Sequence, residues 1–161
     1  MINMFILPEK LMAASENKMK ILFVCSANIC RSPMAEGIMR ELRPDWFVDS
    51  AGICAVGGDA PDRHAVACAA QRGVDISALR SRPVFAEDFA NFDLILTMDD
   101  DSADYLELRR PLGDERYQRA KIDNLAIYAQ ESFVPNPYGS SNFDHVYRLI
   151  EKACQNLSQK F

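Results

Sequence analysis

Short runs of apolar residues, each bounded by polar or turn-forming residues, are the feature that most constrains the fold. They occupy residues 20–24, 46–48 and 94–98, and a weaker run covers residues 121–125. Because these runs are rich in β-branched and aromatic residues and are too short for helices, they predict buried strands. Helical patterns lie between them, so the sequence predicts an α/β fold whose parallel sheet is covered by helices on both faces.

The helices are predicted from apolar residues at helical spacing and from residues that favour helix ends. Ser32 suits the N-cap of the first helix and Pro33 suits its first helical position, while Gly73 suits the end of the second. At the start of the last helix, Ser141 and Asp144 resemble a capping pair ahead of a continuous apolar stripe. The predicted segments cover residues 32–42, 62–72, 87–91, 100–109 and 143–157.

The composition is that of one globular domain. The chain has 161 residues, of which 48% are apolar and 25% charged, close to average usage. Its net charge of −5 argues against nucleic-acid binding, and no run approaches the ~18 apolar residues of a membrane span. Residues 1–18 do not resemble a signal peptide. We expect them to form a loosely ordered extension, or alternatively a surface helix over residues 7–17, before a domain covering residues 19–161.

The five cysteines, at positions 25, 30, 54, 68 and 154, do not follow a metal-binding pattern. The sequence has no Cys-x-x-Cys pair and only two histidines, so we expect neither a zinc site nor another metal or cofactor. An odd number of cysteines in a chain of this size fits a reducing, cytoplasmic environment better than a secreted protein.

Residues 25–32, with the sequence Cys-Ser-Ala-Asn-Ile-Cys-Arg-Ser, connect the first predicted strand to the first predicted helix. Ligands of parallel sheets bind beyond the carboxyl ends of strands, and helix N-termini attract anions. Cys25 would lie at such a strand end, where the helix favours the nucleophilic thiolate. Arg31 offers a planar fork for two phosphate oxygens. The backbone N–H groups that would surround the other oxygens belong to Ser26, Ala27, Asn28, Ile29 and Cys30.

Two further side chains are expected to support this phosphate-binding loop. The amide of Asn28 would hold the loop in shape, and the hydroxyl of Ser32 would donate a hydrogen bond to the thiolate. On spacing alone, Cys25 could equally be a small buried apolar residue and Arg31 a surface charge. The position of the segment between a buried strand and a helix start favours the anion site.

The sequence resembles the low-molecular-weight protein tyrosine phosphatase family over residues 20–157. The resemblance rests on four segments: residues 21–24 running into CSANICRSPMAEG, residues 49–52 (DSAG), residues 93–99 (DLILTMD) and residues 136–139 (NPYG). It implies a four-stranded parallel sheet and hydrolysis of phosphotyrosine through a phosphocysteine on Cys25, with Arg31 binding the phosphate. It also implies that Cys30 forms a reversible disulfide with Cys25, which would protect the thiolate from irreversible oxidation.

The resemblance further implies ligands and a substrate pocket. Expected partners are phosphotyrosine-containing proteins or small aryl phosphates, with phosphate or sulfate ions binding in the loop. Tyr138 would form an aromatic wall for the phenyl ring of the substrate. Three departures from the family pattern concern the loop and pocket: Ala27 replaces a frequent Gly, Leu79 replaces a His that braces the loop, and no aromatic residue lies near residues 56–57.

Asn136 is the departure with the largest chemical consequence. The family has a general-acid Asp at this position, and an amide cannot donate a proton to a leaving phenolate, whose parent phenol has a pKa of ~10. Loss of a general acid typically costs ~10²–10⁴-fold in rate, so we expect slow turnover. Asp144 is a possible replacement, although its position favours helix capping.

Three alternative functions remain at the level of the sequence. The chain could be a catalytically impaired module that binds or traps phosphotyrosine substrates. An arginine-phosphate phosphatase is less favoured, because such relatives have Thr where this chain has Ile29. An arsenate reductase is also less favoured, since it needs a shuttling pair of cysteines and Cys54, Cys68 and Cys154 lie far apart in the sequence.

Overall fold

The computed structural model describes residues 18–161, and the expectations for an N-terminal extension and a helix over residues 7–17 lie outside the described residues. A parallel sheet of four strands forms the centre of the molecule, as predicted, and its strand order is β2-β1-β3-β4. The strands are β1 (Lys20–Cys25), β2 (Phe47–Gly52), β3 (Leu94–Thr97) and β4 (Lys121–Asn124).

Five α-helices and two 3₁₀ turns connect and cover the strands within the described residues. The α-helices are α2 (Arg31–Leu42), α3 (Arg63–Ala70), α4 (Asp88–Asn91), α5 (Asp100–Arg109) and α6 (Phe143–Lys160). The 3₁₀ turns are η1 (Glu115–Gln118) and η2 (Leu125–Ala129). None of the helices within residues 18–161 is long and apolar enough to cross a membrane.

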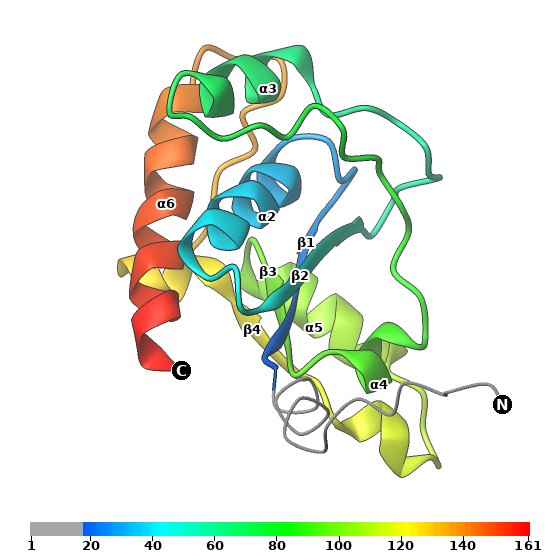
Figure 1. Ribbon diagram of the computed structural model, residues 1–161. Coiled ribbons are helices and arrows are strands. Elements are labelled where there is room, and N and C mark those ends of the chain that lie inside the picture. The colour runs from blue at the N-terminus through cyan, green and yellow to red at the C-terminus, as the bar shows by residue number, and fades with distance from the viewer. Residues whose placement is uncertain (1–17) are drawn as a thin grey trace, which may run out of the picture.

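The side chains of β1 alternate between two apolar cores, one on each face of the sheet. Ile21 and Phe23 belong to the larger core, which contains residues of α2, α3 and α6. Leu22 and Val24 belong to the smaller core, which contains residues of α4 and α5. Figure 1 shows the corresponding layers, with α2 and α6 on one side of the sheet and α5 on the other. Because both faces of β1 are covered, its sequence is a continuous apolar run rather than an alternating one.

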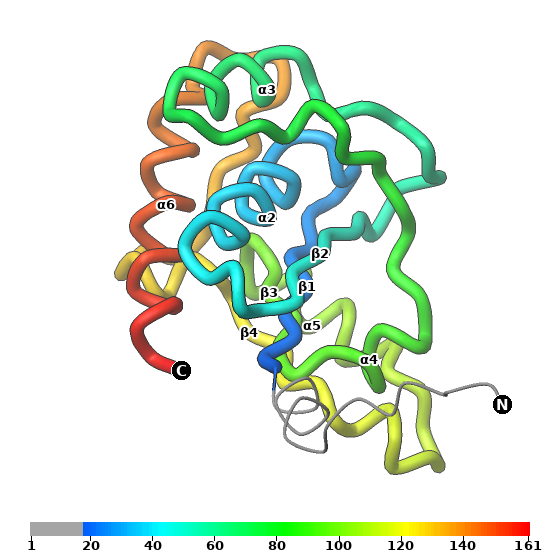
Figure 2. Tube along the Cα trace, viewed as in Figure 1, coloured from blue at the N-terminus to red at the C-terminus, as the bar shows by residue number. Residues whose placement is uncertain are grey.

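The long segment between α3 and α4 lies along the outer edge of β2. Figure 2 shows this segment passing the edge of β2 on its way to α4. Gly52 forms an isolated parallel bridge with Pro83, and its N–H donates to the carbonyl of Arg82 over 2.9 Å. The carboxyl end of β2 is therefore held on both sides, by β1 and by the segment around Arg82.

The N-cap predicted for the first helix was wrong. Helix α2 begins at Arg31, Cys30 occupies the N-cap position, and no side chain caps the helix there. Ser32 lies inside the helix, and its hydroxyl contacts the Cys25 sulfur and the Asn28 amide of the preceding loop. Ser32 is thus used by the loop rather than by the helix end.

The capping pair predicted for the last helix was also wrong. Asn142 precedes α6, and no side chain makes a capping hydrogen bond there. Asp144 instead accepts hydrogen bonds from Arg72 over 3.2 Å and from the thiol of Cys68 over 3.4 Å. The carboxylate therefore joins α6 to the end of α3.

Candidate active site

The loop between β1 and α2 turns its carbonyl groups away from its centre. The carbonyls of Cys25, Ser26 and Ile29 accept hydrogen bonds from backbone N–H groups of residues 53, 54 and 62, over 2.8–2.9 Å. The N–H groups of residues 26–30 find no acceptor within residues 18–161. Because backbone N–H groups of folded proteins normally have partners, this arrangement leaves a set of donors available to an anion.

Asn28 holds the loop in shape from its buried position. Its backbone has a left-handed φ of 59°, a conformation that costs a non-glycine residue free energy. Its side-chain Nδ2 donates to the hydroxyls of Ser32 over 2.8 Å and of Ser50 over 2.9 Å. Its Oδ1 accepts from the backbone N–H of Arg82 over 3.0 Å. Three hydrogen bonds to three different segments therefore stabilise this strained residue.

The sequence had singled out Asn28 and Ser32 but not Ser50 or Arg82. Both lie beside the loop because Ser50 is near the carboxyl end of β2 and the segment of Arg82 follows the edge of that strand. The meeting of parallel strand ends at one edge of the sheet was the signal that could have identified Ser50. Leu79 packs against the larger core.

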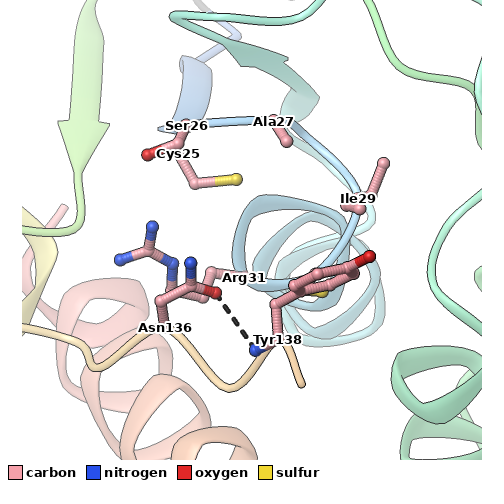
Figure 3. Close-up of a pocket in the computed structure, with 8 residues that line it drawn as sticks. Cys25, Ser26, Ala27, Ile29, Arg31, Asn136 and Tyr138 are labelled. Atoms are coloured by element: carbon pink, nitrogen blue, oxygen red, sulfur yellow. Dashed lines mark hydrogen bonds between the residues drawn. The ribbon is translucent and has the colours of Figure 1, made fainter. Parts of the chain in front are cut away.

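Cys25 lies at the end of β1 and is 4% exposed. Its sulfur is 2.9 Å from the hydroxyl oxygen of Ser32, which is itself buried. In Figure 3 the Cys25 side chain points into the space between the loop and the segment that carries Asn136 and Tyr138. The sulfur is thus positioned to meet a group that enters this space.

Arg31 connects the loop to a segment more than one hundred residues away in the sequence. Its guanidinium Nη1 donates to the carbonyl of Val134 over 2.9 Å, although the side chain stands at the start of α2. The N–H of Val134 donates in turn to the carbonyl of Met98 over 2.7 Å, just beyond β3. Arg31 is 7% exposed, so this hydrogen bond holds its fork in one orientation.

Asn136 and Tyr138 form the opposite side of the cavity. The Oδ1 of Asn136 accepts a hydrogen bond from the backbone N–H of Tyr138 over 3.2 Å, as Figure 3 shows. The ring of Tyr138 lies on the same side as Ile29, and the residue is 64% exposed. Tyr138 is therefore not a buried core residue, and its ring is available to a ligand.

A cavity of about 320 Å³ lies between these two segments. Its lining consists of residues that the sequence had predicted for the site: Cys25, Ser26, Ala27, Ile29, Cys30, Arg31, Asn136 and Tyr138. Asn28 and Ser32 lie behind this lining as supports. Asp144 is not among the lining residues, and its contacts with Arg72 and Cys68 engage its carboxylate elsewhere.

Burial dominates the electrostatics of the second cysteine of the loop. It raises the pKa of the Cys30 thiol to about 12, assisted by the carboxylate of Asp62 and by Cys25, against an opposing effect of Arg31. Cys30 is therefore a neutral thiol at physiological pH. Within residues 18–161, no three His, Cys, Asp or Glu side chains come together as a candidate metal site.

Comparisons with known proteins place this geometry in a family. Residues 20–161 match the family described as Low molecular weight phosphotyrosine protein phosphatase. A Synechocystis protein that carries the name of the low molecular weight protein-tyrosine-phosphatases is 40% identical over 148 residues, which are 86% of this chain and 94% of that protein. The low molecular weight phosphotyrosine protein phosphatase of Sus scrofa is 35% identical over 151 residues, covering 87% and 94% of the two chains.

Solved structures agree with the sequence comparisons. Vibrio vulnificus Wzb in complex with benzylphosphonate superposes with a TM-score of 0.79 at 30% identity, covering 89% of this chain and 99% of that one. The tyrosine phosphatase Wzb from Escherichia coli K30 in complex with sulphate has a TM-score of 0.77 at 27% identity, with coverage of 88% and 96%. The chain belongs to the low molecular weight phosphotyrosine protein phosphatase family.

Proposed function

We propose that this chain hydrolyses phosphotyrosine and small aryl phosphates through a phosphocysteine on Cys25. The single observation that carries the proposal is the cavity that joins the Cys25 sulfur, the Arg31 guanidinium and loop N–H groups that have no acceptor within residues 18–161. In the first step the sulfur attacks phosphorus, an S–P bond forms, and the P–O bond to the aryl group breaks. In the second step water attacks phosphorus, which releases inorganic phosphate and restores the thiol.

Arg31 and the loop N–H groups supply the positive field for both steps. The guanidinium fork binds two phosphate oxygens, and the N–H groups bind the remaining negative charge as it moves in the transition state. The hydrogen bond from Arg31 to the Val134 carbonyl supports this role, because it holds the fork before a substrate binds. Ser32, 2.9 Å from the Cys25 sulfur, stabilises the sulfur as it leaves phosphorus in the second step.

Asn136 limits the rate of both steps in this proposal. An amide cannot protonate the leaving phenolate, nor can it remove a proton from the attacking water. The alternative function, a module that binds or traps phosphotyrosine substrates, is favoured by the engagement of Asn136 Oδ1 with the Tyr138 N–H. In this alternative the loop binds the phosphate group of the substrate, and hydrolysis is slow.

In this proposal the aromatic ring of Tyr138 selects the substrate. The exposed ring of Tyr138 offers a face for offset stacking with a phenyl group, which favours phosphotyrosine over aliphatic phosphate esters. The benzylphosphonate complex of the Vibrio vulnificus relative and the sulphate complex of the Escherichia coli relative support an aryl phosphate or a sulfate ion as ligand.

Cys30 protects the nucleophile from oxidation in this proposal. It lies in the same loop as Cys25, and a disulfide between them would stop the oxidation of Cys25 at a state that a thiol reductant reverses. All five cysteines are free thiols, which supports action in the reducing cytoplasm.

Turnover of a phosphotyrosine peptide by the parent chain and by Cys25→Ser tests the function. We expect steady release of phosphate from the parent and none from Cys25→Ser, with binding of the peptide retained by both. A burst of one phosphate-free peptide per chain without later turnover supports the trapping module instead. Equal turnover by the two proteins contradicts the assignment of Cys25.

A further inference from the structure

The guanidinium group of Arg82 is bound by two carboxylates beside the loop between β1 and α2. Arg82 belongs to the segment between α3 and α4, which passes the edge of β2 in Figure 2. Its Nη1 and Nη2 donate to the two carboxylate oxygens of Asp88 over 3.0 and 3.1 Å, and its Nε donates to Asp49 over 3.1 Å. The side chain of Asp88 is 6% exposed and that of Arg82 is 24% exposed, so the pair is largely buried. Loss of one partner from such a pair leaves an uncompensated charge, so these side chains depend on one another.

The same side chains fix the backbone of the segment that carries Arg82. Nη1 of Arg82 also donates to the carbonyl of Pro83 over 3.0 Å. Asp88 Oδ2 accepts a second hydrogen bond, from the backbone N–H of Phe85 over 2.8 Å. The ion pair between Arg82 and Asp88 therefore determines the course of the backbone over residues 82–88.

Asp49 connects the Arg82 side chain to a second support of the loop. Its Oδ2 accepts from Arg82, and its Oδ1 accepts from the backbone N–H of Ser50 over 2.8 Å. The side chain of Asn28 contacts both neighbours of Asp49, because its Nδ2 donates to the Ser50 hydroxyl and its Oδ1 accepts from the Arg82 backbone N–H. Hydrogen bonds thus form a closed ring through four residues: Asn28, Arg82, Asp49 and Ser50.

This ring contains a strained residue of the loop. The left-handed φ of 59° at Asn28 costs free energy, and the hydrogen bonds of its side chain offset that cost. Two of these hydrogen bonds belong to the ring, and their partners Arg82 and Ser50 are themselves held by Asp49. The conformation of the loop therefore depends on charged side chains that are not part of the loop.

We propose that Arg82, Asp49 and Asp88 are positioning residues, whose ion pairs hold Asn28 and the loop in the anion-binding conformation. None of the three lines the cavity, so they act through the Arg82 backbone and Ser50 rather than on the ligand. Arginine is needed at position 82 because its planar fork reaches two carboxylates and a carbonyl at once, which the single ammonium group of a lysine does not do. The inference rests on the proposed function only in that the loop is the anion site.

Sulfate binding in a Cys25→Ser background tests the proposal. Sulfate stays fully ionised near neutral pH, and the serine removes the reactive thiol, so isothermal titration calorimetry reports on the loop. For Arg82→Lys we expect the dissociation constant of sulfate to rise about two- to tenfold, the effect of losing about one hydrogen bond to Asn28. We expect a rise in the same range for Asp49→Asn, because an asparagine can accept on only one of its two terminal atoms.

Arg110 provides the matched control. Like Arg82, it donates to both oxygens of a carboxylate, that of Glu107, and to a backbone carbonyl, that of Tyr117. Glu107 lies on α5 and Tyr117 in η1, so these contacts do not involve the loop. Arg110→Lys should therefore lower the melting temperature, as Arg82→Lys does, and leave the sulfate affinity at the parental value.

A glycine in place of Asn28 separates positioning of the loop from a general loss of stability. Glycine adopts a left-handed φ without strain, and it lacks the amide group that the ring holds. In an Asn28→Gly background, Arg82→Lys should therefore weaken sulfate binding by a smaller factor than in the parent. If Asn28→Gly binds sulfate too weakly for measurement, the comparison with Arg110→Lys decides.

The outcomes separate this inference from the proposed function. The positioning role is refuted if Arg82→Lys or Asp49→Asn folds and binds sulfate as the Cys25→Ser parent does. It is also refuted if Arg110→Lys weakens binding as much as Arg82→Lys, or if Arg82→Lys has the same effect with Asn28 and with Gly at position 28. These results leave the proposed function intact. If the Cys25→Ser parent binds no sulfate, the loop is not an anion site, and the proposed function fails together with this inference.

Discussion

Replacement of Gly52 by Ala should disable the proposed phosphate-binding loop while the fold persists. A Cβ atom at this position would lie 2.8 Å from the carbonyl oxygen of Ser26, 2.9 Å from the carbonyl carbon of Ala27 and 2.9 Å from the Cβ of Ala55. Carbon atoms in contact prefer about 3.5–4.0 Å, so the overlap with the two carbon atoms is about 0.6–1.1 Å. The added Cβ would collide mainly with backbone atoms of Ser26 and Ala27, and this part of the backbone also carries N–H groups of the loop.

The strand of Gly52 cannot retreat from this contact. The N–H of Gly52 donates a hydrogen bond to the carbonyl of Arg82, and on the other side β2 pairs with β1. The loop must therefore move by a large part of the overlap, at a cost of about 1–3 kcal/mol in stability. A displacement of catalytic groups by about 1 Å typically lowers the rate about 100-fold. We therefore expect kcat/KM of Gly52→Ala for an aryl phosphate to be about 100-fold lower than that of the parent.

Gly37 provides the matched control for this substitution. A Cβ there would meet only side-chain atoms of Ile76 and Val74, which belong to the larger core rather than to the loop. Gly37→Ala should therefore lower the melting temperature in thermal unfolding and leave kcat/KM of the folded protein close to the parental value. Parental kcat/KM in Gly52→Ala, or an equal loss in both variants, refutes the reasoning.

Three further predictions concern the same site. Asn136→Asp should raise the turnover of a phenyl phosphate by about 10²–10⁴-fold in steady-state assays, and an unchanged rate would show that another group is the general acid. After peroxide treatment, the parent should regain activity with a thiol reductant and Cys30→Ser should not, and full recovery of the variant would contradict a protective disulfide. The pKa of Glu36 is about 7 in the folded protein and 4.5 in a free side chain, so the unfolded chain releases the Glu36 proton at lower pH than the folded protein does. The free energy of unfolding should therefore fall by about 3 kcal/mol as the pH rises from 4.5 to above 7. Urea unfolding measured over this pH range should show a smaller fall for Glu36→Gln.

The parts of the fold that follow from local sequence were predictable. Buried strands and helices alternate along the chain, and the loop with Cys25 and Arg31 lies within a single strand–loop–helix unit. Asn136 and Tyr138 are far from this unit in the sequence, and only the family resemblance connected them with it. The order of the strands was not predicted, because it depends on pairing between segments that local patterns do not relate.

The supports of the loop could not be predicted, because they depend on contacts between distant segments. Ser50, Arg82 and Val134 lie 22, 54 and 103 residues from their partners Asn28 and Arg31. The two errors in helix capping have the same origin. Ser32 and Asp144 are good capping residues locally, but tertiary partners use their oxygen atoms instead.

The most direct test of the account is detection of a phosphoryl group on Cys25 during turnover. The parent chain is mixed with an aryl phosphate, quenched in acid within the first turnover, digested, and the peptides are measured by mass spectrometry. The account predicts one phosphoryl group per chain, located on Cys25, which accumulates because Asn136 activates water poorly. Phosphoryl transfer to another residue, or turnover that persists in Cys25→Ser, would contradict it.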